Sequence, residues 1–259
     1  MKILEAGGVL VKSWRQLLAA ILFYTSIPIT AKQPEFRGMA RYAPIVGLLI
    51  GFILIGADNG FRILGMPSLT RSAVIVFLWI SLTGGLHLDG AMDAADGLAV
   101  PDRQRRLTVM ADSHSGAFGV MAAVAILGLK TLALVDLNSY RTLVILLALG
   151  WGRWGQVVAI VRYPYLRSQG KGAIHKIEVH PVVDILTGLV ALFSLGMVYW
   201  LLHPKDGLVL LGLNVGGIAI ATAVGAWFNH QFKGHTGDTY GAVVEWTEAL
   251  LICLATLIV

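Results

Sequence analysis

The sequence predicts an all-α, polytopic integral membrane protein: a helical bundle of about seven transmembrane helices plus an N-terminal interfacial amphipathic helix. Of the 259 residues, 56% are hydrophobic and 14% are charged, against roughly 45–50% and about 25% in soluble domains. The apolar residues form blocks of about 15–21 residues, which can cross a hydrocarbon core about 30 Å thick. No polar stretch exceeds about 30 residues, so we expect residues 1–259 to form a single membrane-embedded domain.

Seven blocks are long and apolar enough to span a membrane or nearly so. They cover about residues 43–57, 72–86, 117–135, 141–161, 182–202, 207–227 and 241–259. No internal repeat or long linker separates them. The sequence contains a single cysteine, Cys253, in the last block. Because there is only one, an intrachain disulfide and a thiolate metal cluster are excluded.

An eighth apolar segment, Leu17–Ile29, is short, contains Pro28 and begins beside Trp14 and Arg15. If this segment crosses the membrane, eleven basic residues outside the spans lie on one face and seven on the other. If it lies in the interface, the two faces carry fourteen and four. Cytoplasmic loops carry the excess of Lys and Arg, so the more polarised arrangement predicts an interfacial helix. The segments that this arrangement places on the cytoplasmic face are 30–42, 87–112, 162–181 and 228–240.

The net charge of +5 is typical of loops that set membrane topology and contact anionic lipid, so we expect no nucleic-acid partner. No small-residue cleavage site follows the first apolar run, so we expect the N-terminus to be retained. The charge bias places the polar segments on the cytoplasmic face, and we expect the protein in a bacterial or archaeal cytoplasmic (inner) membrane.

Three carboxylates, Asp89, Asp93 and Asp96, stand at positions i, i+4 and i+7. On a helix they fall within about 60° of one another. The residues between them are small or apolar, and no basic residue follows until Arg103. Like charges near a membrane interior are costly, and hard oxygen ligands favour Mg²⁺, Mn²⁺ or Ca²⁺. The pattern predicts a metal site, the alternative being a solvated acidic face.

Asp112, at the start of the next span, is either a fourth carboxylate of this cluster or a helix N-cap. The basic stretch before it contains Arg103, Arg105 and Arg106. Guanidinium groups bind phosphate through planar, bidentate contacts, but positive-inside anchoring explains these arginines equally well.

Two basic residues fall inside apolar spans. Arg153 lies between Trp151 and Trp154, where an isolated charge is costly; it either contacts a substrate phosphate or pairs with a carboxylate such as Glu245. For Lys130 we expect snorkelling towards an interface.

The last span begins with three acids, Asp238, Glu245 and Glu248. Glu245 and Glu248 are one turn apart on one face, so we expect this helix to complete the pocket. His87, two residues before Asp89, is placed to orient a carboxylate or phosphate. The pairs His175/His180 and His230/His235 are five residues apart, about 140° around a helix, which disfavours a helical zinc site.

Short motifs along nearly the whole chain carry a family resemblance. They are Arg41 to Gly47, Gly85-Leu86-His87-Leu88-Asp89-Gly90, Asp93, Asp96-Gly97-Leu98, Asp112-Ser113, Gly116-Ala117-Phe118-Gly119, Gly152-Arg153-Trp154, Tyr163-Pro164-Tyr165 with Arg167 and Gly170, and Gly237-Asp238-Thr239-Tyr240-Gly241-Ala242. Together they resemble the cobalamin synthase family, the adenosylcobinamide-GDP ribazoletransferases. The acidic motif is the specific part, and the departures at Met92, Ala94 and Ala99-Val100 remove no carboxylate.

The resemblance implies a Mg²⁺-dependent phosphotransferase of cobalamin (vitamin B12) biosynthesis. A ribose hydroxyl of α-ribazole, or of its 5′-phosphate, attacks the phosphate joined to cobinamide, and GMP leaves. Phosphoryl transfer needs charge neutralisation and positioning, which carboxylate-held Mg²⁺ supplies, and a carboxylate can accept the hydroxyl proton. The expected catalytic and metal-binding residues are Asp89, Asp93, Asp96 and Asp112. The expected substrate-binding residues are His87, Arg103, Arg153, Arg167, Asp238 and Glu245.

Two other functions compete with this one. The core Asp93-x-x-Asp96-Gly97 is similar to that of CDP-alcohol phosphotransferases of phospholipid synthesis, but the remainder of that family's pattern is missing. An ion-coupled transporter also places acids in spans, but it tends to show repeats and acids in mid-span. The expected partners are the two substrates and the lipid bilayer, and association of the chain with itself is left open.

Overall fold

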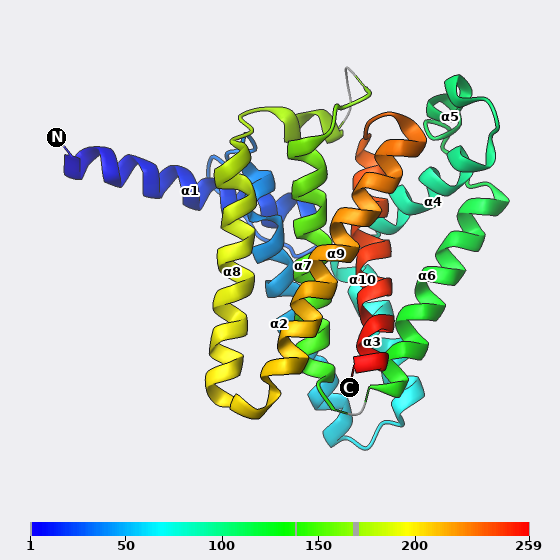
Figure 1. The fold of residues 1–259 in the computed structure, drawn as a ribbon. Helices are drawn as coiled ribbons and strands as arrows, with labels where there is room; N and C mark the ends of the chain where they lie inside the picture. Colours follow the sequence, from blue (N-terminus) through cyan, green and yellow to red (C-terminus); the bar gives the residue numbers. More distant parts are fainter. Residues whose placement is uncertain (1, 138, 168–170, 259) are drawn as a thin grey trace.

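The computed structural model describes residues 2–137, 139–167 and 171–258, which form helices joined by short loops (Figure 1). The elements are, in chain order, α1 (Lys2–Tyr24), η1 (Met39–Tyr42), α2 (Ala43–Ile63), α3 (Ser68–Leu82), α4 (Leu86–Ala99), α5 (Arg103–Val109), α6 (Ala117–Asp136), α7 (Arg141–Arg162), η2 (Lys171–Lys176), α8 (Pro181–Leu202), η3 (Pro204–Asp206), α9 (Gly207–Phe232) and α10 (Gly237–Ile258). No strand occurs in these ranges apart from one isolated bridge. The predicted all-α bundle is confirmed.

Six described helices are each long and apolar enough to cross a membrane, and a bent pair of helices makes up to seven. Six predicted spans coincide with α2, α6, α7, α8, α9 and α10. The helices extend the predictions at several ends; α9, for example, continues to Phe232. Residue 259, the last of the final predicted span, lies outside the described residues.

The predicted span at 72–86 is wrong as a single straight helix. α3 ends at Leu82, and the chain turns by 91° before α4 begins at Leu86. Gly84 and Gly85 adopt left-handed backbone conformations, with φ of 60° and 72°, which glycine adopts without steric cost. At 1.5 Å per residue, 15-residue α3 is shorter than the roughly 30 Å core of a bilayer. The turn therefore sends the acidic helix across the bundle.

Helix α7 forms the centre of the bundle and is buried along nearly its whole length. It packs against α2, α8, α9 and α10, and Figure 1 shows these helices around it. Between Leu143 and Val161 its sequence is apolar on every side except at Arg153 and Gln156, as expected for a helix surrounded by protein. α8 and α9 bury a much smaller share of their length, so their apolar outer faces suit contact with lipid.

Helix α1 lies across one end of the bundle instead of running along the long helices (Figure 1). It ends at Tyr24, before the predicted limit at Ile29, because Pro28 disfavours helix at the residue before it. Trp14 is exposed while Ala19, Ala20 and Tyr24 are buried, an amphipathic pattern in keeping with the predicted interfacial helix.

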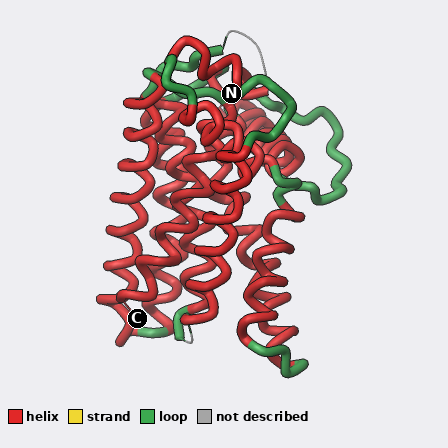
Figure 2. The backbone as a smooth tube through the Cα atoms, turned by 90° about the vertical axis from the view of Figure 1, so that its right-hand side faces the viewer, coloured by secondary structure: helices red, strands yellow, loops and turns green. Residues whose placement is uncertain are grey.

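The polar segments gather at the end of the bundle that holds α1, as Figures 1 and 2 show. This end contains the loop after α1, α4, α5, the segment after α7 and the turn between α9 and α10. The loops that follow α2, α6 and α8 lie at the other end. The predicted grouping is therefore confirmed for the described parts of these segments. Residues 168–170 of the predicted segment 162–181, which include Gly170 of the family motif, lie outside the described residues.

Candidate active site

The acidic helix α4 crosses the first turns of α10 at very short range. A side chain on Gly90 would place its Cβ 2.7 Å from the carbonyl oxygen of Asp238. A Cβ on Gly241 would lie 2.8 Å from the carbonyl oxygen of His87. Both distances are shorter than real Cβ contacts, so only glycine fits at this crossing. The two glycines thereby bring Asp89 on α4 beside Asp238 on α10.

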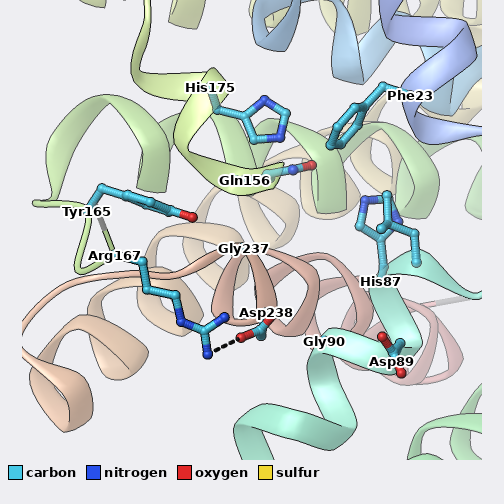
Figure 3. A pocket seen from close by; sticks show the side chains of 12 residues that line it. Phe23, His87, Asp89, Gly90, Gln156, Tyr165, Arg167, His175, Gly237 and Asp238 are labelled. Atoms are coloured by element: carbon cyan, nitrogen blue, oxygen red, sulfur yellow. Dashed lines mark ion pairs between the residues drawn. The ribbon is translucent and has the colours of Figure 1, made fainter. Parts of the chain in front are cut away.

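A cavity of about 260 Å³ opens beside this crossing. Four residues expected from the sequence to act in the site line it together: His87, Asp89, Arg167 and Asp238 (Figure 3). The cavity is also lined by residues that were not among the expected site residues, from α1, α4, α7, the segment after α7 and α10. These are Phe23, Leu86, Gly90, Gln156, Tyr165, Gly172, His175 and Gly237.

One end of the cavity is charged. Arg167 Nη2 lies 3.1 Å from Asp238 Oδ2, which also accepts a hydrogen bond from Thr236 Oγ1 at 3.3 Å. Asp89 is exposed and Asp93 is half-buried, and neither forms an ion pair or side-chain hydrogen bond with any residue whose placement is described. The lining includes Asp89 and Asp238 but not Asp93, which lies one turn farther along α4. Two carboxylates in the lining thus face one guanidinium, which leaves this end with a net negative charge and with carboxylate oxygens that are free to bind a cation.

Asp96 has a structural role that the sequence did not predict. Its Oδ2 accepts a hydrogen bond from the backbone N–H of Gly116 at 2.7 Å, and its Oδ1 accepts one from Gly119 at 2.8 Å. These N–H groups begin α6, where intrahelical partners are missing. Asp96 therefore caps α6 from another helix, and the N-cap role considered for Asp112 is wrong.

Asp112 and Arg103 lie outside the cavity. Asp112 is exposed, and its Oδ1 lies 2.7 Å from His114 Nδ1 and accepts the backbone N–H of His114 at 3.0 Å. These hydrogen bonds lower the pKa of the Asp112 carboxyl. Arg103 is exposed in the first turn of α5. The structure brings neither side chain to the carboxylates of α4, so their roles in the site stay predictions without geometric support.

The donors at the charged end suit a hard divalent ion. Asp89, Asp93 and Asp238 offer carboxylate oxygens, the ligands that Mg²⁺ prefers. Within the described part of the chain, no three His, Cys, Asp or Glu side chains meet closely enough to hold one ion. The donor chemistry fits Mg²⁺, while the carboxylates as they lie do not close a shell around it.

The other end of the cavity is lined by rings and an amide. Phe23 and His175 pack edge to face with centroids 4.9 Å apart, and Gln156 projects from α7 (Figure 3). Burial lowers the pKa of His175 to about 4, so its ring is neutral near pH 7. Gln156 is a polar residue within an apolar span and could have been found from the sequence; Phe23 and His175 gave no comparable signal.

Lys130, Arg153, Glu245 and Glu248 form a separate, buried ion network inside the bundle. Lys130 Nζ lies 2.7 Å from Glu245 Oε2 and 2.6 Å from Glu248 Oε2, and Arg153 Nη1 lies 2.7 Å from Glu248 Oε1. Each of these side chains is at most 3% exposed. The snorkelling predicted for Lys130 is wrong, because two carboxylates hold its ammonium group inside the bundle.

The pairing alternative for Arg153 is confirmed, with Glu248 as the partner in place of Glu245. The cavity lining includes neither Arg153 nor Glu245, so their substrate contacts stay predictions, and Glu245 does not complete the pocket as expected. Gly152 makes the network possible, since a Cβ there would lie 2.7 Å from Glu248 Cγ.

A family model described as cobalamin-5-phosphate synthase matches residues 16–256. The chain belongs to this family. Three similar relatives are each named adenosylcobinamide-GDP ribazoletransferase. The protein of Trichormus variabilis is 56% identical over 93% of this chain and 96% of its own length. Those of Synechococcus elongatus and Synechocystis sp. are 54% and 50% identical, over 92% and 90% of this chain and 94% and 91% of their own lengths. No solved structure matches the chain.

Family membership decides among the three functions that the sequence left in competition. It favours the cobalamin synthases over the CDP-alcohol phosphotransferases and the ion-coupled transporters. The match covers both the α4 acids and the start of α10, so the cavity between them is the candidate active site.

Proposed function

We propose that this chain is an adenosylcobinamide-GDP ribazoletransferase. It joins adenosylcobinamide-GDP to α-ribazole, or to α-ribazole 5′-phosphate, and yields adenosylcobalamin, or its 5′-phosphate, and GMP. The observation that carries the proposal is the cavity in which Asp89 of α4, Asp238 of α10 and Arg167 converge in a chain of this family. Phosphoryl transfer depends on positioning and charge neutralisation, and this cavity offers groups for both.

The chain's own residues have separable tasks in this reaction. The guanidinium group of Arg167, which lies 3.1 Å from Asp238 Oδ2, binds a phosphate oxygen of the substrate. Asp89 or Asp93 accepts the proton of the attacking ribose hydroxyl, because neither has a partner among the described residues that would compete for it. The hydroxyl oxygen forms the new bond to phosphorus, and the bond to the GMP oxygen breaks.

Mg²⁺ dependence is part of the proposal. Asp89, Asp93 and Asp238 would hold the ion, and Mg²⁺ when bound supplies neutralisation of the phosphate charge. Asp96 retains lone pairs beyond the two that cap α6. Asp112 is the least supported of the four ligands expected from the sequence, because it lies exposed beside His114.

The direct test is turnover by the purified chain in lipid vesicles. Both substrates together should yield GMP and the cobalamin product in equal amounts, and either substrate alone should yield neither. Chelation of divalent ions should stop the reaction, and added Mg²⁺ should restore it. Turnover that continues unchanged with a chelator present would contradict the metal part of the proposal alone.

We also propose that the chain resides in the cytoplasmic membrane with the cavity facing the cytoplasm. The bundle end that holds the cavity carries most of the basic residues outside the spans, in accord with the positive-inside rule. Single cysteines introduced at Gln104 and Ser139 in a Cys253→Ala background test this. Residue 104 should react with an impermeant reagent only from the cytoplasmic side, and residue 139 only from the other side.

A further inference from the structure

Two buried polar side chains that line the cavity lack hydrogen-bond partners. His87 is 2% exposed and neither of its ring nitrogens is bonded; Gln156 is also 2% exposed and its Oε1 accepts no hydrogen bond. These statements refer to partners within the described ranges. Buried polar groups are almost always satisfied in native proteins, because an unmet one costs about 1–3 kcal/mol. The two residues, from different helices, therefore point to a bound group that completes their hydrogen bonds.

The end of the cavity that is lined by Phe23, His87, Gln156 and His175 suits a flat ring. Tyr24 packs nearly parallel to His87 and to His175: its centroid is 6.0 Å from that of His87 at 22° and 5.7 Å from that of His175 at 6°. Figure 3 shows Phe23, His175, Gln156 and His87 grouped together, away from the Arg167–Asp238 pair. The rings of this group are fixed by one another, which favours an aromatic ligand held by stacking or edge contacts.

This end of the cavity is also neutral and small. The charged lining residues, Asp89, Arg167 and Asp238, belong to the other end (Figure 3). The whole cavity measures about 260 Å³, slightly below the roughly 300–1,000 Å³ of typical small-molecule sites. It therefore accommodates a base-sized part of a substrate beside a phosphate, and not a whole macrocyclic ligand.

We propose that the group formed by Phe23, His87, Gln156 and His175 is the binding site for the guanine base of the nucleotide-activated substrate, a deduction that rests on the proposed function. The Gln156 amide has an acceptor and a donor side by side, and guanine presents N1–H and O6 in the complementary order. The base of α-ribazole, a benzimidazole joined to ribose through nitrogen, has no N–H to offer Oε1. The third base of the reaction, the adenine of the adenosyl group, is carried by the macrocycle, which this cavity of about 260 Å³ does not accommodate. Guanine is therefore the base that both meets the unsatisfied acceptor and is joined to the phosphate through its ribose.

The test uses GMP, 1-methyl-GMP and α-ribazole as probes, and equilibrium dialysis against the detergent-purified full chain. 1-Methyl-GMP lacks the N1–H that Gln156 accepts, so it should bind the unmodified protein at least tenfold more weakly than GMP. Gln156→Leu should weaken GMP binding at least tenfold, about 1.4 kcal/mol, and abolish the difference between the two nucleotides. The affinity for α-ribazole should not change.

Asn214→Leu is the matched control. Asn214 is likewise a buried amide of a membrane helix with an unpartnered oxygen among the described residues, but it lies on α9 and outside the cavity. It should bind all three probes like the unmodified protein. In turnover, Gln156→Leu should raise the KM for adenosylcobinamide-GDP and leave that for α-ribazole unchanged.

Equal binding of GMP and 1-methyl-GMP by the unmodified protein would overturn the guanine site without any variant, even if Gln156→Leu fails to fold. Loss of α-ribazole affinity in Gln156→Leu with GMP binding intact would also overturn it. The proposed function fails separately: no product from the two substrates, with the dependence of GMP binding on Gln156 intact, rejects the transferase activity and keeps the base site.

Discussion

Helix α10 contributes acids to two groups that differ in burial and in charge balance. At its first turn, Asp238 lines a cavity with Asp89 of α4, and Asp93 follows one turn farther along α4; Arg167 is the one Lys or Arg side chain in the described lining. Farther along, Glu245 and Glu248 are fully buried with Lys130 and Arg153, so that two carboxylates meet two cations. The first group is open and unbalanced, and the second is closed and neutral overall.

This difference separates chemistry from stability. A buried charge that loses its partner is costly, so the closed network holds α6, α7 and α10 together. Carboxylates that remain without partners beside a cavity can be tolerated when a ligand or ion supplies the missing charge. The acids at the start of α10 and on α4 are therefore expected to govern turnover, and those inside the bundle are expected to govern unfolding.

The largest effect should come from breaking the closed network with Glu248→Gln. This change leaves Lys130 and Arg153 with one carboxylate between them and should lower the free energy of unfolding by about 3–5 kcal/mol. Thermal unfolding in detergent would measure it. Replacing Lys130 and Glu245 together, as Lys130→Met with Glu245→Leu, removes a balanced pair and should cost much less. Equal losses in the two proteins would contradict the role assigned to charge balance.

The second effect concerns the open group. Asp93→Asn preserves size and removes one charge, and it should lower kcat at least 100-fold, equivalent to about 2.7 kcal/mol, while the unfolding temperature stays within a few degrees of the parent's. Initial rates of GMP release would measure it. Asp136→Asn, an exposed carboxylate at the other end of the bundle, is the control. A variant at Asp93 that lost stability but kept its rate would place this acid with the closed network.

A third prediction concerns the crossing that assembles the open group. Gly90→Ala pushes α4 away from Asp238, because its Cβ would lie 2.7–2.8 Å from backbone atoms of that residue. Overpacking of this kind costs about 1–3 kcal/mol, and the displaced acids should reduce kcat about tenfold. Gly128→Ala, which meets nothing within 4 Å, should change neither quantity. Full activity of Gly90→Ala would show that the separation of α4 and α10 is not critical.

The last prediction is a pH dependence that arises at the cavity end of the bundle. Burial lowers the pKa of His175 and of His235 to about 4, against 6.5 in the unfolded chain. Between pH 6.5 and 4 the unfolded state therefore binds more protons, and stability falls as the pH falls, by up to about 1.4 kcal/mol per pH unit for each histidine. Unfolding temperatures at pH 7 and 5 would measure it. His175→Asn should flatten this dependence, and an unchanged slope would exclude His175 as a source.

Local sequence patterns were sufficient for the helices but not for the turn between α3 and α4. Six spans were recognised because apolar runs of their length have few other structures available. Gly84 and Gly85 were visible in the sequence, yet glycine pairs also occur within membrane helices, so only the packed structure revealed a 91° bend. The bend explains why the acidic motif begins a new helix.

The sequence by itself determined the all-α membrane class, the end of the bundle that holds the polar segments, and the acidic stripe of α4, since each follows from hydropathy, charge bias or helical periodicity. Only the tertiary structure decided which acids have partners: that Asp96 caps α6, that Asp112 lies exposed, and that Glu245 and Glu248 bind Lys130 and Arg153. The reason is that ion pairing and burial depend on contacts between residues as many as 118 positions apart, and periodicity along one helix carries no information about the helix it will face.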